Sequence, residues 1–151
     1  MDEEVARVQE VLARIADAAG VEATVEVRED SDGLMAEFIG EDLGLLIGHH
    51  GQTIDAIQHL AYRISAHGAS ERKPVTVEAA GYRERRAVTL RSTADQAAHD
   101  AIREHRPVSL EAMSALERKV IHEHLKTRHD VETYSEGQEP ARRLVVAPLV
   151  D

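Results

Sequence analysis

Apolar residues at helical spacing predict a first helix over residues 2–19. Its buried face is expected at Val5, Val8, Leu12, Ile15 and Ala19. Gly20 follows directly, in the place where helices commonly end in a residue with positive φ. The pattern then changes to two short runs of strand character, residues 23–28 and 34–39, joined by an Asp-Ser-Asp-Gly turn at 30–33. The chain is therefore predicted to begin with a helix and a β-hairpin.

A turn bounded by glycines separates the next two predicted helices. Asp42 is placed to cap a short helix that ends at Ile47, and residues 48–51, Gly-His-His-Gly, interrupt the helical pattern. A longer helix to about His67 is predicted from Ile54, Ile57, Ala61 and Ile64. Glycine at both ends of the turn allows a tight bend and the close approach of another backbone. Amides at the start of the longer helix, at its positive dipole end, would form a cradle for a phosphate.

A third strand completes the first predicted module. Val75 and Val77 alternate with polar residues over 74–79, as expected for a strand with one buried face. Gly81 follows as the predicted boundary. The fold class is therefore predicted as α+β, with two small α/β modules at residues 1–80 and 81–151.

The second module is predicted to begin with a long helix from Tyr82 to about His105, ahead of Pro107. Its first turn carries three arginines, Arg83, Arg85 and Arg86. The helix dipole disfavours cations there by roughly a few tenths of a kcal/mol each. Either these arginines form a solvated face relieved by Glu84, or an acidic neighbour or an outside anion compensates them.

A short strand near Val108 and Leu110 and a second helix follow. Ser114 and Glu117 form a capping box at the start of that helix. One half of its surface is predicted to be apolar, with Met113, Leu116, Val120, Ile121 and Leu125. The other half is predicted to be basic, with Arg118, Lys119, His122 and Lys126, and His129 continues this line. Residues 131–134 and 142–147 are predicted to close the module as a hairpin.

Composition narrows the classes of function. The 151 residues carry a net charge of −10 and no cysteine, so a disulfide framework and Cys-ligated zinc are excluded. Residues 1–80 hold 16 acidic and 6 basic residues, whereas residues 81–151 hold 12 of each. The acidic balance argues against a general nucleic acid binder, so the basic residues of the second half would have to share a face. The scarcity of aromatic residues argues against a sheet that stacks several bases; they are Phe38, Tyr62, Tyr82 and Tyr134.

The sequence contains no apolar run of membrane-spanning length and no signal-peptide pattern. We therefore expect a cytoplasmic protein without membrane insertion.

Two local motifs carry a resemblance to known domains. Residues 47–53, IGHHGQT, together with the predicted order of elements, resemble a type II KH domain with its Gly-x-x-Gly loop. Arg118 and His122, in ERKVIH, match the Arg-x-x-x-His signature of the R-three-H domain, which would comprise the long helix, short strand, helix and closing hairpin.

The order of the two motifs along the chain is similar to that of the bacterial Jag family (SpoIIIJ-associated, KhpB/EloR-like). GYRERR at 81–86, PVSLEAMS at 107–114 and SEGQEPARRLVV at 135–146 extend the similarity over nearly the whole chain. The resemblance implies a protein that binds single-stranded nucleic acid, RNA before single-stranded DNA. It also implies a cytoplasmic post-transcriptional regulator tied to the cell envelope or to division.

The sequence departs from this family in two respects. Many relatives carry a further N-terminal domain, whereas this sequence begins at the KH helix. Relatives also commonly place Lys or Arg inside the loop, where this chain has His49 and His50. Because the unperturbed side-chain pKa of histidine is about 6.5, such a loop should be mostly uncharged at neutral pH and should bind phosphate more weakly.

The predicted interface has two parts. The first is the loop and the start of the next helix, where about four nucleotides would lie with their bases in an apolar groove; its residues are Gly48, His49, His50, Gly51, Gln52 and Thr53. In the second part, Arg118 and His122 hold a further stretch of phosphate backbone. Weaker candidates are Lys119, Lys126, Arg83, Arg85 and Arg86. A polar loop tip without a ligand and an exposed i, i+4 pair remain the alternatives for the two parts.

Two other classes of function compete with this interpretation. A metal site that includes His122 and His124 is disfavoured, because residues two apart on a helix point about 200° apart. The loop lacks the Lys-Ser/Thr of a P-loop, and no nucleophile–base set is recognisable, so no enzyme, cofactor or metal is predicted. The remaining rival is a protein-interaction adaptor. Its acidic first half would dock a basic partner, or its sheet edge would pair with a second KH-domain protein.

Overall fold

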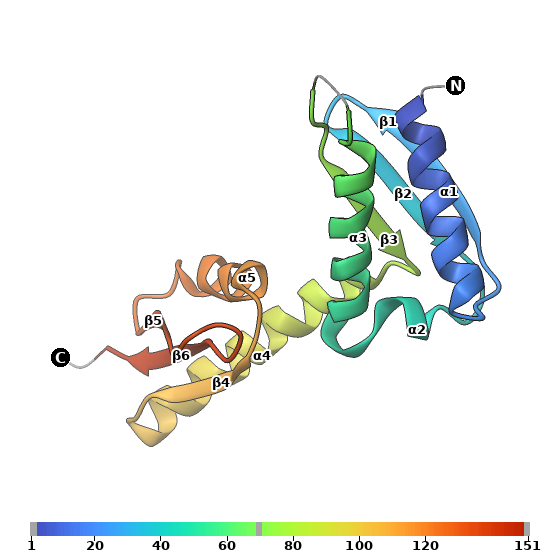
Figure 1. Ribbon diagram of the computed structural model, residues 1–151. Coiled ribbons are helices and arrows are strands. Elements are labelled where there is room, and N and C mark those ends of the chain that lie inside the picture. Colours follow the sequence, from blue (N-terminus) through green and yellow to red (C-terminus); the bar gives the residue numbers. More distant parts are fainter. Residues whose placement is uncertain (1–2, 69–70, 150–151) are drawn as a thin grey trace. The chain divides into compact units, whose positions relative to one another are not determined.

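The computed structural model describes residues 3–68 and 71–149. The chain divides into two compact units, residues 1–83 and 84–151. The division falls in the first turn of helix α4 (Tyr82–Glu104), which is drawn in Figure 1.

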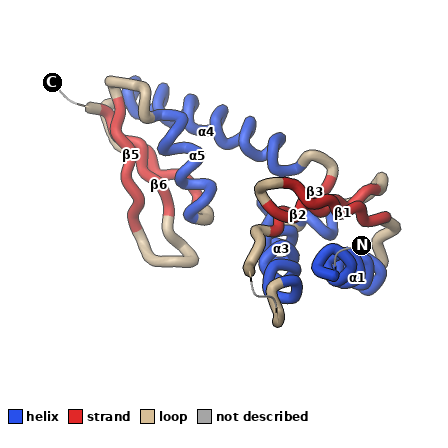
Figure 2. Tube along the Cα trace, turned by 90° about the horizontal axis from the view of Figure 1, so that it is seen from above, coloured by secondary structure: helices blue, strands red, loops and turns tan. Residues whose placement is uncertain are grey.

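The first unit has the element order predicted for a type II KH domain. Its elements are α1 (Glu3–Ala18), β1 (Thr24–Asp30), β2 (Gly33–Ile39), α2 (Gly44–Ile47), a 3-10 turn (His49–Gly51), α3 (Gln52–Ser65) and β3 (Val75–Ala79). In the three-stranded sheet, β2 lies in the middle and pairs antiparallel with β1 and parallel with β3. Helices α1 and α3 cover one face of this sheet, as Figure 2 shows.

The core of the first unit lies between that face and the two helices. Alternate residues of β2 point into it, with Leu34, Ala36 and Phe38 at most 2% exposed. Leu46 of α2 and Ile54 of α3 are buried on either side of the Gly-His-His-Gly turn, at 1% and 0% exposed. Both ends of the loop are therefore fixed by the core.

The prediction that Asp42 caps α2 is wrong. The N-cap residue is Leu43, and no side chain accepts a hydrogen bond in the capping position. Leu43 is 4% exposed. Burial of this leucine with Leu46 sets the start of α2 one residue later than the position of Asp42 predicts.

The second unit also has the predicted order. It contains most of α4, followed by β4 (Val108–Ala112), α5 (Ala115–Leu125), β5 (Val131–Glu136) and β6 (Arg143–Pro148). The strands form an antiparallel sheet in the order β4-β6-β5. Small residues of α4 pack with apolar residues of α5 and of the sheet to form the core, which includes Ala94, Ala98, Ala101, Ile121, Leu125, Leu144 and Val146. Among the described residues, no helix is both long and apolar enough to cross a membrane.

The predicted division of α5 into an apolar and a basic half is partly wrong. Leu116 is 74% exposed, whereas Arg118 is only 8% exposed. The capping box is also modified, because the Glu117 amide donates to Ser114 Oγ at 3.3 Å while the Glu117 carboxylate pairs with Arg86. Contacts with segments distant in the sequence determine which side of α5 is covered.

Candidate nucleic-acid interface

The turn between α2 and α3 requires an unusual backbone. Gly48 has φ 74° and ψ −177°, His50 has φ 52° and ψ 28°, and Gly51 has φ 76° and ψ 13°. Three residues of four thus have positive φ, a region that glycine enters readily and histidine enters at a cost of about 1–2 kcal/mol. The two glycines are therefore needed for the path of the loop.

The glycines also make room for neighbouring side chains. A Cβ atom at Gly48 would collide with the Thr53 hydroxyl, and one at Gly51 would lie 2.5 Å from Cε1 of Tyr82. We predicted from the sequence that the glycines would allow another backbone to approach. At Gly48 the Thr53 amide nitrogen does approach, because it would lie 3.0 Å from a Cβ atom there, whereas the close neighbour of Gly51 is the Tyr82 side chain and Gly51 itself is buried.

The loop presents two stacked histidines and the start of α3. The ring centroids of His49 and His50 are 3.8 Å apart, and the planes are inclined by 26°. His49 is exposed and His50 is half-buried, while Gln52 and Thr53 are exposed in the first turn of α3. The N-cap residue of α3 is a glycine, which offers no side-chain acceptor to the first amides of the helix. The predicted loop residues therefore lie together in one continuous segment.

Arg83 and Arg86, at the start of α4, are engaged within the protein. Arg83 donates to Asp55 Oδ1 at 2.8 Å, to Gln58 Oε1 at 2.9 Å and to the Val77 carbonyl at 3.1 Å. The charge of Arg83 is therefore compensated by an acidic neighbour, which is one of the alternatives that the sequence left open.

Arg86 follows the same pattern in the second unit. It donates through Nε and Nη2 to the two carboxylate oxygens of Glu117, at 2.7 and 3.2 Å. Both side chains of this pair are at most 16% exposed. Arg85 is exposed.

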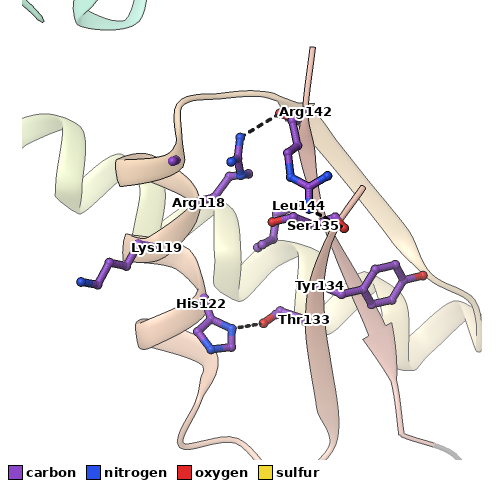
Figure 3. Close-up of a pocket in the computed structure, with 9 residues that line it drawn as sticks. Arg118, Lys119, His122, Thr133, Tyr134, Ser135, Arg142 and Leu144 are labelled. Atoms are coloured by element: carbon purple, nitrogen blue, oxygen red, sulfur yellow. Dashed lines mark hydrogen bonds between the residues drawn. The ribbon is translucent and has the colours of Figure 1, made fainter. Parts of the chain in front are cut away.

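The Arg118 side chain is turned into the second unit. Its Nη1 donates to the Met113 carbonyl at 2.8 Å, and its Nη2 donates to Glu139 Oε1 at 2.7 Å. Nη1 also donates to the Arg142 carbonyl at 3.4 Å, the contact drawn in Figure 3. The prediction that Arg118 lies on an exposed face of α5 is therefore wrong. A guanidinium can be buried there because these three acceptors replace water.

His122 stays at the surface, beside a hollow between α5 and the β5–β6 hairpin. This hollow has a volume of about 450 Å³ and is lined by Ala115, Arg118, Lys119, His122, Thr133, Tyr134, Ser135, Arg142 and Leu144. His122 Nδ1 lies 2.5 Å from Thr133 Oγ1, which holds the imidazole ring next to β5. Figure 3 shows the Tyr134 ring directed away from His122.

The sequence alone did not predict the polar residues that β5 and the following turn contribute to this hollow, which are Thr133, Tyr134, Ser135 and Arg142. The alternation of a strand would have placed Thr133 on the face of β5 shared with Val131, which is buried. The position of Arg142 depends on the 137–142 turn, and no periodic signal describes such a turn.

The remaining basic candidates on α5 differ in position. Lys119 lines the hollow and is exposed. Lys126 does not line it, and its Nζ lies 4.0 Å from Glu123. His124 Nε2 lies 2.8 Å from Asp95 of α4, which leaves His122 and His124 directed to different partners. Within residues 3–68 and 71–149, no group of three or more His, Asp and Glu residues is arranged to hold a metal ion.

The turn after α5 is neutralised internally. The Arg128 guanidinium donates to both carboxylate oxygens of Asp130, at 2.9 and 2.8 Å. These hydrogen bonds hold the pKa of Asp130 below its ordinary value and raise the pKa of Arg128. The two charges therefore compensate each other at this end of the helix.

Comparison with known domain families gives two matches. Residues 6–78 match the KH domain of KhpA/KhpB, and residues 88–148 match the R-three-H domain. The first match contains the Gly-His-His-Gly loop, and the second contains the hollow beside His122.

Several bacterial relatives share both regions. The RNA-binding protein KhpB of Lactiplantibacillus plantarum is 40% identical over 128 residues, which are 85% of this chain and 40% of the relative. The proteins of the same name from Clostridium symbiosum and Bacillus subtilis are 36% and 34% identical, over 91% and 90% of this chain and 63% and 66% of the relatives. The chain thus spans about two fifths to two thirds of the length of these relatives.

Proposed function

The chain belongs to the Jag (KhpB) family, and from this premise we propose that it binds single-stranded RNA through two surfaces, one on each unit. The observation that carries the proposal is the conformation of the Gly-His-His-Gly loop, which ends at a helix whose N-cap residue supplies no side-chain acceptor. The name of the relatives, RNA-binding protein KhpB, favours RNA over single-stranded DNA.

At the first surface, phosphates of the RNA accept hydrogen bonds from amides at the start of α3. Amides at a helix N-terminus combine free donors with the positive end of the dipole, so they suit an anion. The imidazole rings of His49 and His50 add hydrogen-bond donors. Gln52 and Thr53, the first two residues of α3, are also exposed beside the loop. Leu45, one turn before the loop, is 71% exposed and supplies apolar surface for a base.

At the second surface, the hollow of the R-three-H unit holds a further stretch of RNA backbone. Lys119 and His122 reach its rim from one side of α5, and both are exposed. Because phosphate contacts carry no base information, this surface adds affinity with little sequence preference. It therefore complements the first surface, where bases can be read.

The proposed role is that of a cytoplasmic post-transcriptional regulator of the cell envelope or of division, without enzymatic activity. It rests on family membership, and we keep Gly81 as the proposed boundary between the KH and R-three-H domains. A second KH-domain protein is a further proposed partner.

One observation favours an adaptor as the second candidate function. Glu26, Glu37 and Glu78 pair in register across all three strands of the KH sheet. They lie on the face opposite the core residues of β2, because successive side chains of a strand alternate. Like charges directly opposite one another in a sheet are destabilising, and a basic protein partner would relieve this repulsion.

Binding of a labelled single-stranded RNA, followed by fluorescence anisotropy over a series of salt concentrations, tests the proposal. Affinity should fall with rising salt by a log–log slope of about 0.7 per phosphate contacted. Changing His49→Asp and His50→Asp together should weaken binding by at least about tenfold, because two anions are then placed beside phosphate. His105→Asp is the matched control, since His105 is an exposed histidine outside both surfaces.

Unchanged binding by the double variant would contradict the role of the loop. Equal affinity for a DNA strand of the same sequence would contradict the preference for RNA. Absence of oligonucleotide binding, together with a basic protein that binds and is lost when Glu26 and Glu37 are changed to Gln, would favour the adaptor.

A further inference from the structure

We infer that Arg142, rather than Arg118, is the arginine that contacts phosphate in the hollow of the R-three-H unit, and that Arg118 is a positioning residue. It rests on the proposed RNA binding and identifies the guanidinium that contacts the RNA backbone at the second surface. Both arginines line the hollow, but their partners differ in charge.

The charge of Arg118 is already compensated. Its side chain is 9% exposed and forms an ion pair with Glu139 at 2.7 Å. Its Nη1 is shared between the Met113 and Arg142 carbonyls. A phosphate would have to displace the carboxylate and expose the two carbonyls, so Arg118 is poorly placed to bind a further anion.

The contacts of Arg118 instead hold the rim of the hollow together. They join the start of α5 to the residue after β4 and to the turn between β5 and β6. The Arg142 carbonyl also accepts from the Met113 amide at 3.2 Å, so two donors fix the backbone of Arg142. Arg118 therefore helps to fix the backbone position from which the Arg142 side chain extends.

The charge of Arg142 is not compensated in this way. Within the described part of the chain, its guanidinium donates to two neutral backbone carbonyls, that of Gly137 at 2.6 Å and that of Ser135 at 3.5 Å. A guanidinium has five N–H donors, so others remain for a ligand. These two bonds orient the group over β5 without neutralising it.

Two further groups on α5 share the same hollow. Lys119 is exposed there and forms no ion pair within the segments 3–68 and 71–149, and His122 is held by Thr133. The hollow thus gathers two uncompensated cations and an imidazole from α5 and from the β5–β6 turn. Planar bidentate donation from a guanidinium, with a point charge from lysine, suits a phosphodiester group.

Charge-neutral variants distinguish the two arginines. Arg142→Gln removes the charge but keeps a shorter polar side chain with an amide donor. Arg143→Gln is its matched control because Arg143 is exposed on β6 and does not line the hollow. For a single-stranded RNA, Arg142→Gln should weaken binding by about fivefold or more and lower the salt slope by about 0.7, with unchanged melting temperature. Arg118→Gln should lower the melting temperature and leave the salt slope of the folded protein unchanged.

A nitrogen-15 NMR titration of the full chain with inorganic phosphate tests the site independently of RNA. The Arg142 Nε–H signal should shift, and the Arg118 Nε–H signal should not. The inference is overturned if Arg118 shifts while Arg142 does not, or if Arg118→Gln lowers the slope at unchanged melting temperature. If RNA fails to bind but phosphate shifts Arg142, the anion site stands and the proposed RNA binding is what fails.

Discussion

Gly51 lies directly against the ring of Tyr82. A methyl group at residue 51 would come within 2.5 Å of Cε1 and within 2.8 Å of the phenolic oxygen of Tyr82. The loop proposed to bind RNA is therefore shaped by a residue that follows β3 and begins α4. The glycine is required for packing inside the KH unit.

Gly51→Ala should destabilise the protein more than Gly20→Ala. Both glycines have positive φ, 76° and 72°, so each alanine meets a backbone cost of about 1–2 kcal/mol. Nothing lies within 4 Å of a Cβ at Gly20, whereas the Tyr82 ring must move to admit a methyl group at residue 51, which adds roughly 1–3 kcal/mol. Free energies of unfolding from denaturant titrations measure both effects.

The same comparison in a Tyr82→Ala background isolates the contact. Once the ring is absent, Gly51→Ala should cost about as much as Gly20→Ala, within roughly 0.5 kcal/mol. An equal penalty for both glycines in the wild-type background would show that the ring yields without cost.

The ion pair between Arg86 and Glu117 should contribute more stability than an exposed pair. Glu117→Gln leaves Arg86 among residues that exclude most water, and the loss should be about 2 kcal/mol. Glu10→Gln is the matched control, because its partner Arg14 is 79% exposed and such surface pairs contribute about 0.5 kcal/mol or less. Denaturant unfolding of Arg86→Gln, of Glu117→Gln and of the variant that carries both changes gives the coupling energy of the pair, and a coupling near zero would contradict the prediction.

Periodicity predicted most of the fold because each core face repeats along a single element. The alternation of Leu34, Ala36 and Phe38 defines the buried face of β2 without reference to any other segment. The motif Arg-x-x-x-His likewise led to the hollow of the R-three-H unit. A helical pattern alone, however, could not place Arg118 inside the protein.

The burial of Arg118 and the pairing of Glu117 depend on residues far apart in the sequence. Arg118 is buried because Glu139 and the Arg142 carbonyl reach it from the turn before β6. Glu117 turns to Arg86, 31 residues earlier, instead of completing a capping box. No local pattern contains such a partner, so the position of these side chains required the structure.

Lower pH should strengthen RNA binding at the glycine loop. Histidine changes charge between pH 5 and 8, and only its protonated form adds a positive charge beside phosphate. Affinity should therefore rise as pH falls from 8 to 6.

Anisotropy titrations at constant ionic strength check this pH dependence. His49→Asn with His50→Asn should flatten it, and His105→Asn should leave it unchanged. A dependence that persists in the double variant and vanishes in His122→Asn would assign it to the hollow of the R-three-H unit instead.

Lys119 of α5 and Lys126 at the C-terminal end of that helix provide a matched pair of residues for testing the second surface. Lys119 lines the hollow, whereas Lys126 lies outside it beside Glu123. Lys119→Gln should lower affinity for RNAs of unrelated sequence by a similar factor and reduce the salt slope by about 0.7, because a phosphate contact carries no base information. Lys126→Gln removes the same charge close by, so any effect of net charge alone appears in both variants. Equal losses of RNA affinity in the two variants would mean that binding depends on the overall charge of α5. That result would contradict a specific contact between RNA and the hollow.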